Sequence, residues 1–461
     1  MADESSGLWN NLPSIIIVEI FSLLSVKDRL NASSTCKAWR GNLFHPKLWR
    51  KVVFHLNSCD NPKTVNNNQN DGARFLSKRC GHFVQEVVIE LNSLNPRDVQ
   101  RCKEVLRVLS SNNNLRALSI KPLSSRLEWV DYDDTFSLDE YIEYLCKIIQ
   151  QARCLEHLSL GFIEELLDVS DHLLCMLTEN QALCIRSLHL SSIKEVPDNY
   201  FVNTMNSSMF KSFFRLEFLS IDYDYMNDQL LDVLSQPQKR PLRRLSIHVH
   251  SFYYPFRKVG DAAWNLLRSH SPCLEVTLNL LHFHSSYLFI HNILSSEMPL
   301  AHFRVYFSSG FNVEILTEIA FLNESSLKSI VLVDELNESS NHGIQSIDPL
   351  IMLAWKCKKL TYMKIIGYEV NADSLIAISR LRGTELKDLL VPVCCLSTLQ
   401  IEENASVSRS RALAEMTEQV SFSLQRNWRP MTYDELPLAV RNVDVDADGA
   451  YLEELLEDQT W

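Results

Sequence analysis

The chain has 461 residues, of which 46% are hydrophobic and 22% are charged. This composition is typical of a folded protein and excludes a largely disordered chain. Only 11 residues are glycine, which argues against glycine-rich nucleotide-binding folds and turn-dense all-β folds. The net charge of −12 is concentrated at the end of the chain, where residues 432–461 contain nine acidic residues and one arginine. Because the rest is nearly neutral, we expect no nucleic-acid partner.

The cysteines and the first residues bear on the cellular compartment. None of the twelve cysteines forms a Cys-x-x-Cys motif or a Cys/His cluster with zinc spacing, so we expect no metal site. Residues 1–4 lack the basic and apolar regions of a signal peptide. No apolar run approaches the roughly 20 residues that span a bilayer. We therefore expect an intracellular protein of the cytosol or nucleus, without a membrane partner and without a cofactor.

Residues 8–50 carry the signals of three short helices. Leu12-Pro13 precedes the first helix, since proline is tolerated in a first helical turn. Its apolar residues recur at helical spacing, as Ile16, Ile20, Leu23 and Leu24. Asp28 is expected to cap the second helix. The third helix has an apolar face made of Cys36, Trp39 and Leu43, and Pro46 interrupts the chain after it.

This helical region is too small to bury its own apolar side chains comfortably. Domains of fewer than about 50 residues usually need a partner or a covalent staple. Two tryptophans and several isoleucines and leucines are left over, and exposed apolar surface of that kind usually marks a protein interface. The alternative is that the region simply packs against the rest of the chain.

Five segments of this region, read in order and at their spacing, resemble the F-box: Leu12-Pro13, Glu19–Leu24, Asp28–Leu30, Cys36–Arg40 and Pro46–Arg50. One position departs from the F-box pattern, because Ile15 stands where an acidic residue is usual. The resemblance implies binding to Skp1. The Skp1-facing surface or its immediate support would be formed by Leu12, Pro13, Ile20, Phe21, Leu24, Cys36, Trp39 and Trp49. For Trp39, a role in the core of the small domain is an equal alternative.

A short motif recurs after an Asn-rich stretch at residues 57–72 that indicates a linker or exposed loop. The motif is apolar-x-x-apolar-x-apolar. It begins at residues 84, 115, 155, 185, 216, 242, 274, 300, 327, 360 and 386. Most steps lie at or slightly above the 20–29 residues of a leucine-rich repeat. We divide the chain into an F-box (1–55), a linker (56–75), a repeat solenoid (76–425) and an acidic tail or cap (426–461).

The spacing of the motif predicts its geometry. The last two apolar residues lie two apart, so on a strand both face the interior, and the residues between them face the concave side. Residues 227–234 and 261–267 are expected to be helices on the convex side. The repeats lack the Asn or Cys that normally follows the strand, and residues 124–137 read as an insertion, so we expect an irregular solenoid. Each repeat buries its apolar face only against its neighbours.

An F-box followed by such repeats is similar to the F-box/leucine-rich-repeat proteins. Four further segments resemble the F-box only protein 33 group, which is related to F-box only protein 39: Phe218–Ile221, Asp228–Leu231, Trp428–Pro430 and Asp434–Pro437. The implied fold is an α/β repeat, with a three-helix F-box and an irregular leucine-rich-repeat solenoid whose parallel strands line the concave face.

The implied function is that of a substrate-recognition adaptor in an SCF (Skp1–cullin–F-box) ubiquitin ligase. Such an adaptor binds Skp1, and through it the cullin and RING subunits, and presents an unidentified protein substrate for ubiquitination and degradation. It is not an enzyme. Its substrate contacts are expected at outward strand positions, namely His157, His189, Phe218, Arg244, His248, Tyr362 and Lys364. The alternative is a repeat scaffold that binds partners without directing ubiquitination, and an active site has no support in the sequence.

Three other features bear on metal binding and on the role of the tail. Residues 444–449 copy the first half of a calcium-binding EF-hand loop, but Leu455 stands where the bidentate Glu belongs, which favours a solvated tail. The alternating histidines favour contact or solvated positions over a metal site, and they are His248, His250, His282 and His284. The tail's last apolar residues, within 451–456, have helical spacing and are expected to cap the solenoid or to bind a partner.

Overall fold

The computed structural model describes residues 9, 11–56, 72–128, 138–167, 169–194, 206–250, 258–283, 287–308, 311–336, 348–397, 406–442 and 444–459. The chain forms two compact units. Unit 1 comprises Met1–Gly161 and Asp168–Ile185, and unit 2 comprises Phe162–Leu167 and Arg186–Trp461. In the part that the structure describes, no helix is long and apolar enough to cross a membrane.

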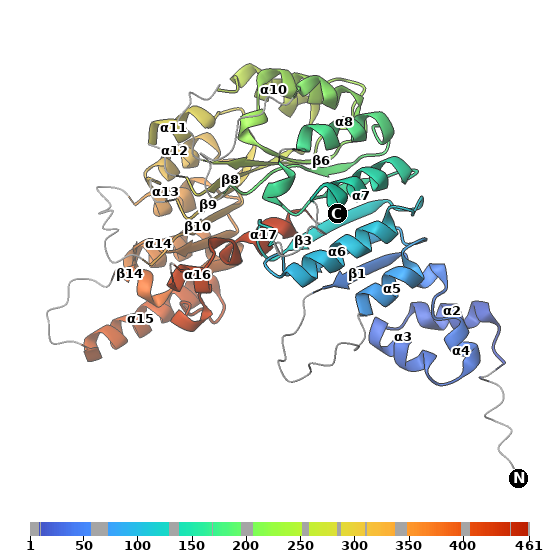
Figure 1. Ribbon diagram of the computed structural model, residues 1–461. Coiled ribbons are helices and arrows are strands. Elements are labelled where there is room, and N and C mark those ends of the chain that lie inside the picture. Colours follow the sequence, from blue (N-terminus) through green and yellow to red (C-terminus); the bar gives the residue numbers. More distant parts are fainter. Residues whose placement is uncertain are drawn as a thin grey trace, which may run out of the picture. The chain divides into compact units, whose positions relative to one another are not determined.

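The N-terminal helical region opens unit 1 and is drawn in dark blue in Figure 1. It contains α2 (Ser14–Ser22), α3 (Val26–Ser33), α4 (Lys37–Gly41) and the 3-10 turn η1 (Pro46–Trp49). The three predicted helices are therefore confirmed. The cap predicted for α3 was wrong, because Ser25 caps this helix and its Oγ accepts a hydrogen bond from the Asp28 backbone N–H at 3.1 Å. Asp28 lies one turn inside the helix instead, where a carboxylate also stabilises the helix dipole.

Arg29 ties the helices of this region together. Its guanidinium is buried and donates hydrogen bonds to the backbone carbonyls of Phe21, Leu24 and Leu48. It also lies over the Trp49 ring, 5.4 Å from the ring centroid. Burial lowers the pKa of Arg29 from its ordinary value. Since these carbonyls lie at the end of α2 and in η1, this side chain joins the two elements, which Lys47 of η1 and Glu19 of α2 also connect by an ion pair.

The rest of unit 1 consists of parallel strands with helices on one side. The strands pair in the order β1 (Lys51–His55), β2 (Glu86–Leu91), β3 (Ala117–Pro122) and β4 (His157–Ser159). The helices are α5 (Gly72–Cys80), α6 (Pro96–Leu109), α7 (Leu138–Gln151) and α8 (Ser170–Asn180). The sequence motif had not indicated β1, which adds a strand directly after the helical region.

Unit 2 repeats the same arrangement over a longer stretch. Its strands, all parallel in sequence order, are β5 (Ser187–His189), β6 (Phe218–Asp222), β7 (Arg244–Val249), β8 (Glu275–Leu281), β9 (Leu300–Tyr306), β10 (Ser329–Val333), β11 (Tyr362–Ile366) and β13 (Asp388–Leu390). A short pair, β12 (Val370–Asn371) and β14 (Leu396–Ser397), lies beside them. Its helices are α9 (Asp228–Leu234), α10 (Asp261–His270), α11 (Tyr287–Ile293), α12 (Ile315–Leu322), α13 (Pro349–Lys356), α14 (Ala372–Arg382) and α15 (Ser406–Leu424). Figure 1 shows α10–α15 outside the strands.

Several 3-10 turns connect these elements. They are η2 (Glu164–Leu166), η4 (Ser207–Ser212), η5 (Tyr223–Tyr225), η6 (Gly383–Glu385) and η7 (Val393–Cys395). The chain ends with η8 (Tyr433–Glu435), α16 (Leu438–Arg441), η9 (Ala447–Ala450) and α17 (Leu452–Glu457).

The strand register confirms the repeat prediction. Equivalent apolar residues of neighbouring repeats lie opposite each other, as in Leu219↔Leu245 and Ile221↔Ile247, and all four are buried. The helices predicted at residues 227–234 and 261–267 are α9 and α10. The insertion predicted at residues 124–137 lies largely outside the described residues. The repeats therefore build a leucine-rich-repeat solenoid with a continuous apolar interior.

Buried polar side chains take the place of the missing repeat asparagine. Each of them follows a helix and reaches back to a backbone carbonyl of the preceding repeat. Asn112 donates to the Val84 carbonyl at 2.7 Å, and Asn323 donates to the Met298 carbonyl at 3.0 Å. Gln181 and Lys239 do the same, each with two carbonyls. These bonds join neighbouring repeats and add a side-chain donor to the backbone carbonyls, of which Met298 and Phe210 also accept a backbone N–H.

Candidate interaction surfaces

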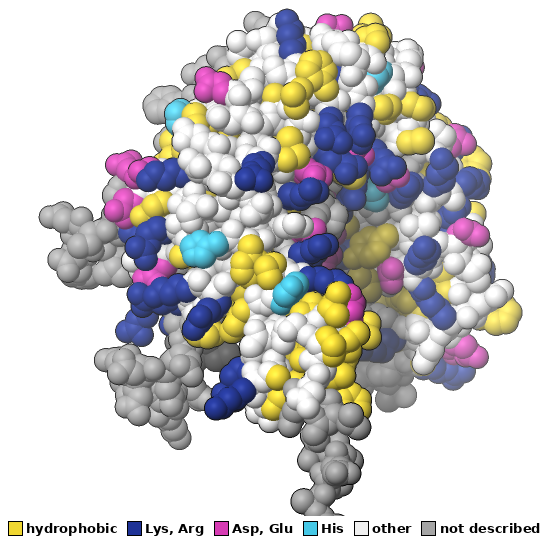
Figure 2. Space-filling view, turned by 90° about the vertical axis from the view of Figure 1, so that its right-hand side faces the viewer, with side chains coloured by type: hydrophobic (Ala, Val, Ile, Leu, Met, Phe, Trp, Pro, Cys, Tyr) yellow, Lys and Arg dark blue, Asp and Glu magenta, His cyan; other side chains and the backbone are white. Residues whose placement is uncertain are grey.

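The N-terminal helical region leaves large apolar side chains exposed. Leu23 is 86% exposed and Ile15 is 71% exposed. Four more described apolar residues of this region are also exposed, namely Trp9, Ile16, Val26 and Leu30. Figure 2 shows hydrophobic side chains gathered on the lowest described part of the molecule, at the height of this region in Figure 1. A folded protein rarely exposes so many apolar side chains within one small domain unless a partner covers them.

The apolar stripe predicted for the first helix lies largely on this outer surface. Ile16 and Leu23 point away from the core, while Ile17, Val18 and Phe21 are the residues of α2 that are buried. The periodicity of an almost wholly apolar helix does not distinguish two opposite faces, since both satisfy it. The sequence prediction therefore identified the helix but selected its outer face as the apolar stripe.

The residues that the F-box resemblance implicates in Skp1 binding fall into three groups. Phe21 and Trp49 are buried and support the surface from below. Pro13 is exposed and caps α2. The others are half-buried, namely Leu12, Ile20, Leu24, Cys36 and Trp39. The most exposed apolar residues, Leu23 and Ile15, were absent from the predicted set although Leu23 lies within the recognised motif.

Trp39 combines the two roles that the sequence left open. Its ring packs edge-on against Phe21 with centroids 5.6 Å apart, so it takes part in the core. Its Nε1–H donates to the Trp9 carbonyl at 3.1 Å, and the side chain stays half-buried. A partner seated on this surface would therefore cover the edge of Trp39 and the adjoining Trp9 together.

The concave face of unit 2, which is the strand face opposite the helices, is filled by the chain's own C-terminal segment. This segment, residues 436–459, buries apolar side chains against strands β8–β11. The residues it contributes are Leu436, Ala439, Val440, Tyr451, Leu452, Leu455 and Leu456, and the strand side contributes Leu281, Tyr306, Val331, Val333 and Ile366. The Tyr451 ring stacks on Tyr306 with centroids 4.9 Å apart. The segment is therefore part of the core of unit 2.

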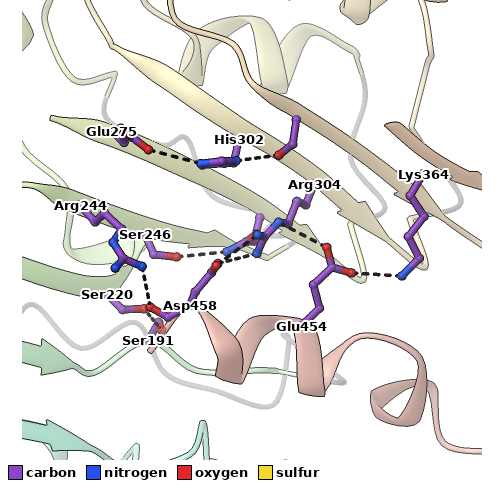
Figure 3. Close-up of polar contacts among 12 residues, drawn as sticks. Ser191, Ser220, Arg244, Ser246, Glu275, His302, Arg304, Lys364, Glu454 and Asp458 are labelled. Carbon is purple, nitrogen blue, oxygen red and sulfur yellow. Dashed lines mark hydrogen bonds and ion pairs between the residues drawn. The ribbon is translucent and has the colours of Figure 1, made fainter. Parts of the chain in front are cut away.

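Polar contacts join the same segment to the strands (Figure 3). Arg304 forms a two-armed ion pair with the Asp458 carboxylate, and its Nε lies 3.7 Å from Glu454. Lys364 contacts Glu454 at 3.1 Å, and Tyr451 bonds His282 at 2.7 Å. Burial alone would lower the pKa of Arg304, but Asp458 raises it above its ordinary value. The acidic tail thus neutralises cations that the strands place on the concave face.

The first part of the C-terminal region covers the last strands, as a cap would. The Trp428 indole donates to the Leu389 carbonyl in β13 at 2.7 Å. Met431 forms a parallel bridge with Pro392. The helix expected at the end of the tail is α17, and it lies along the concave face instead of over the end strand.

A groove of about 720 Å³ remains beside α17. One wall consists of strand residues and the loops before them, and the other wall consists mainly of the C-terminal segment. The strand wall contains His302, Arg304, Lys328, Tyr362 and Lys364, and the other wall contains Glu435 and, from the C-terminal segment, Glu453, Glu454, Glu457 and Asp458. Arg304 pairs with Asp458 and Lys364 pairs with Glu454 across the groove.

The predicted substrate contacts are only partly on accessible surface. His157, His189 and His248 are buried. Arg244 is exposed and lies 4.9 Å above the half-buried Phe218 ring. Tyr362 and Lys364 line the groove beside α17. Sequence spacing placed Tyr362 and Lys364 on the concave face without indicating that the tail returns beside them.

Buried charges lie at the ends of β5–β7. Lys194 contacts Asp222 at 3.6 Å and Asp224 at 2.7 Å, and Asp222 accepts two hydrogen bonds from Ser192. His248 bonds the Ser192 carbonyl at 2.8 Å. Burial opposes the charged form of Asp222, but Lys194 lowers its pKa below its ordinary value. These contacts join the loops that follow β5 and β6 to β7.

The histidines and the acidic loop show no metal geometry. His248, His250 and His282 are buried rather than solvated, and His284 lies outside the described residues. Asp446 caps η9 and Asp448 accepts a hydrogen bond from the Tyr451 hydroxyl at 2.7 Å. Among the described ranges, no group of three or more His, Cys, Asp or Glu side chains could hold a metal ion.

Comparison with known proteins supports the sequence resemblance. Residues 9–55 match the F-box-like family model. The chain is 27% identical to F-box only protein 33 of Mus musculus over 484 residues, which cover 91% of this chain and 82% of that protein. It is 26% identical to F-box/LRR-repeat protein 21 of Bos taurus, over 93% of this chain and 90% of that protein. The predicted F-box and the predicted relationship to F-box/leucine-rich-repeat proteins are therefore confirmed.

Two solved structures are similar to the chain. One is the leucine-rich repeat-containing protein LegL7 from Legionella pneumophila, with a TM-score of 0.33 and 15% identity over 73% of this chain and 98% of that one. The other is the complex of Rad7 and Elc1 in yeast, with a TM-score of 0.43 and 14% identity over 86% of this chain and 92% of that one.

Proposed function

We propose that this F-box/leucine-rich-repeat chain is a substrate-recognition adaptor of an SCF-type ubiquitin ligase. The observation that carries the proposal is the exposed apolar surface of residues 9–30, which lies within the F-box-like domain. The resemblance of this surface to the F-box names Skp1 as its partner, and Skp1 in turn connects the chain to the cullin and RING subunits. Unit 2 supplies the surface that recognises the protein to be ubiquitinated.

In this role the chain needs no reactive group of its own. An adaptor accelerates ubiquitination by holding its target near the ubiquitin-carrying enzyme, which raises the effective concentration of the reacting groups. The buried Lys194 and Asp222 side chains pair with each other and join loops at the strand ends. The proposed product is a ubiquitinated protein destined for degradation.

Coprecipitation of the full chain with purified Skp1 tests the proposal. We expect the wild-type chain to retrieve Skp1 and the variants Leu12→Ala and Trp39→Ala to retrieve much less. Leu183→Ala is the matched control, because Leu183 is 67% exposed and lies outside the F-box-like domain. If the wild-type chain retrieves no Skp1, the ligase proposal fails and a repeat scaffold without ubiquitination becomes the better description.

A further inference from the structure

Three arginines surround one carboxylate in front of strands β5–β7 of unit 2. Glu217 accepts hydrogen bonds from Arg186 at 2.9 and 3.0 Å and from Arg240 at 2.8 Å, and Arg243 lies 3.8 Å away. Although burial would raise the pKa of Glu217, the hydrogen bonds from Arg240 and Arg186 lower it. Glu217 is therefore ionised and fixes the positions of the guanidinium groups around it. We call Arg186, Arg240 and Arg243 the arginine cluster.

The arginine cluster carries more positive charge than Glu217 neutralises. Three arginines and one carboxylate give a net charge of +2, and the exposed Arg215 lies two residues before Glu217. The neighbouring Lys239 adds a buried ammonium group that bonds the Phe210 and Phe213 carbonyls. Toward β8, the next acidic residue at a strand start is Glu275, which contacts Lys328 and His302. Like charges held this close repel one another unless an anion joins them.

The guanidinium groups are accessible from solvent while their anchor is not. The Glu217 side chain is 8% exposed, whereas the side chains of Arg240 and Arg243 are 47% and 67% exposed. A guanidinium has five N–H donors. Glu217 accepts one hydrogen bond from Arg240, and Arg243 contacts it only at ion-pair distance. The carboxylate therefore forms the floor of the cluster, and donors of Arg240 and Arg243 are directed to the surface above it.

We propose that the arginine cluster binds a phosphate group on a phosphorylated segment of the protein that unit 2 recruits. This inference deepens the proposed adaptor function and rests on it for the identity of the ligand as a substrate protein. It does not depend on Skp1 binding.

The chemistry of phosphate fits the cluster better than that of a single carboxylate. A phosphoserine carries nearly two negative charges at neutral pH, with three acceptor oxygens, and so matches the net charge above Glu217. Arginine pairs with phosphate through two parallel N–H···O bonds, which fixes orientation as well as charge. In the described part of the acidic tail, the Asp458 carboxylate pairs with Arg304, and its backbone carbonyl accepts a hydrogen bond from Arg244, next to the cluster, at 3.4 Å.

Fluorescence polarisation of the full chain provides the test. The probes are two labelled degenerate peptide mixtures that differ only in a central phosphoserine or unmodified serine. We expect the phosphoserine mixture to bind at least about tenfold more tightly, as expected for charge-assisted hydrogen bonds. Added inorganic phosphate and raised salt should both weaken this binding. Equal binding of the two mixtures would overturn the proposal.

Variants assign the binding to these side chains. Arg243→Gln leaves Arg186 and Arg240 on Glu217, so it should keep the wild-type melting temperature while phosphopeptide affinity falls about tenfold. Arg268→Gln is the control, since Arg268 is 51% exposed on α10 and faces Glu297. If Arg243→Gln and the double variant with Arg240→Gln bind like the wild type, the cluster only joins loops and the proposal fails. If phosphopeptide binding persists in a chain that retrieves no Skp1, the adaptor function fails and the phosphate site stands.

Discussion

The two units treat their apolar surface in opposite ways. In unit 1, the N-terminal helical region exposes Leu23 and Ile15 almost fully. In unit 2, apolar side chains on the concave face, such as Tyr306 and Ile366, are completely buried by the chain's own C-terminal segment. The first surface lacks a cover among the described residues of its own unit, while the second has one. The comparison teaches that apolar character alone does not identify an interface, because the chain itself can supply the partner.

The two surfaces also differ in chemistry. The C-terminal segment brings carboxylates that match the basic strand residues Arg304 and Lys364. The exposed surface of the helical region is formed by apolar side chains over a core that Arg29 holds together from inside. A substitution on the exposed surface of the helical region should therefore change partner binding. A substitution between the C-terminal segment and the strands should change the stability of unit 2.

Removal of the C-terminal cover should have the largest effect. Deleting residues 442–461 takes away Tyr451, Leu452, Leu455 and Leu456, and each fully buried side chain of this kind contributes about 1.5–3 kcal/mol. Their sum approaches the whole stability of a typical domain, about 5–15 kcal/mol. We expect the truncated chain to lose the cooperative thermal transition of unit 2, measured by circular dichroism. We also expect it to bind a hydrophobic dye. An unchanged thermal transition would show that unit 2 is stable without the segment.

Two neighbouring residues of the first helix should separate binding from stability. Phe21 is fully buried, so Phe21→Ala should lower the free energy of unfolding of its unit by about 3–5 kcal/mol. Leu23 is 86% exposed, so Leu23→Ala should change stability by less than about 0.5 kcal/mol. Its effect should appear instead as weaker Skp1 binding, measured by calorimetry. Equal Skp1 affinity of Leu23→Ala and wild type would remove this surface from the interface.

The ion pair of Arg304 should matter because it is buried. Arg304→Leu leaves the Asp458 carboxylate without its cation, while Glu454 keeps Lys364, and the loss of one partner of a buried pair costs about 3–5 kcal/mol. Adding Asp458→Leu should recover part of this loss. Arg411→Leu is the control, since the Arg411–Glu415 pair on α15 is largely exposed and such pairs contribute about 0–1 kcal/mol. Similar losses from both single variants in denaturant titrations would contradict the buried position of Arg304.

The stability of unit 2 should decline in mild acid. Burial lowers the pKa of His248 to about 4 and that of His189 to about 3, from an ordinary value of 6.5. Because the unfolded chain binds these protons first, their contribution is fully present above pH 6.5 and is lost as the pH falls toward 4. For His248 the loss at pH 5 is about 2 kcal/mol. Asp224, whose pKa burial raises, opposes part of it.

Unfolding of wild type and His248→Gln in denaturant at pH 7.5 and pH 5 measures this effect. The variant should show the smaller difference between the two pH values. Equal differences would indicate that His248 is protonated as easily in the folded chain as in the unfolded one.

The parts that the sequence predicted are those encoded by nearby residues. The leucine-rich repeats could be identified because each repeat contains its own strand pattern, as in Leu242, Leu245 and Ile247, and all three are buried. The F-box could be identified because its residues lie close together in order. The return of the tail could not be predicted, since Tyr451 meets His282 and Tyr306 across more than a hundred residues. Its helical spacing predicted α17 but not the surface that α17 covers.

The arginine cluster shows the same limit. Arg186, Glu217 and Arg243 each precede a strand of a different repeat. Nothing in their spacing along the sequence indicates that the two arginines meet at the Glu217 carboxylate. The cap of α3 was missed for a local reason, because Ser25 and Asp28 are both good capping residues and only the backbone geometry selects Ser25.

Hydrogen–deuterium exchange of the full chain, with and without Skp1, tests the contrast between the two surfaces most directly. The amides of α17 should exchange slowly in the free chain and stay unchanged on Skp1 addition, because the chain already covers them. The amides of α2 and α3 should become protected only when Skp1 is added. Fast exchange in α17, or no protection of α2 and α3, would contradict the account.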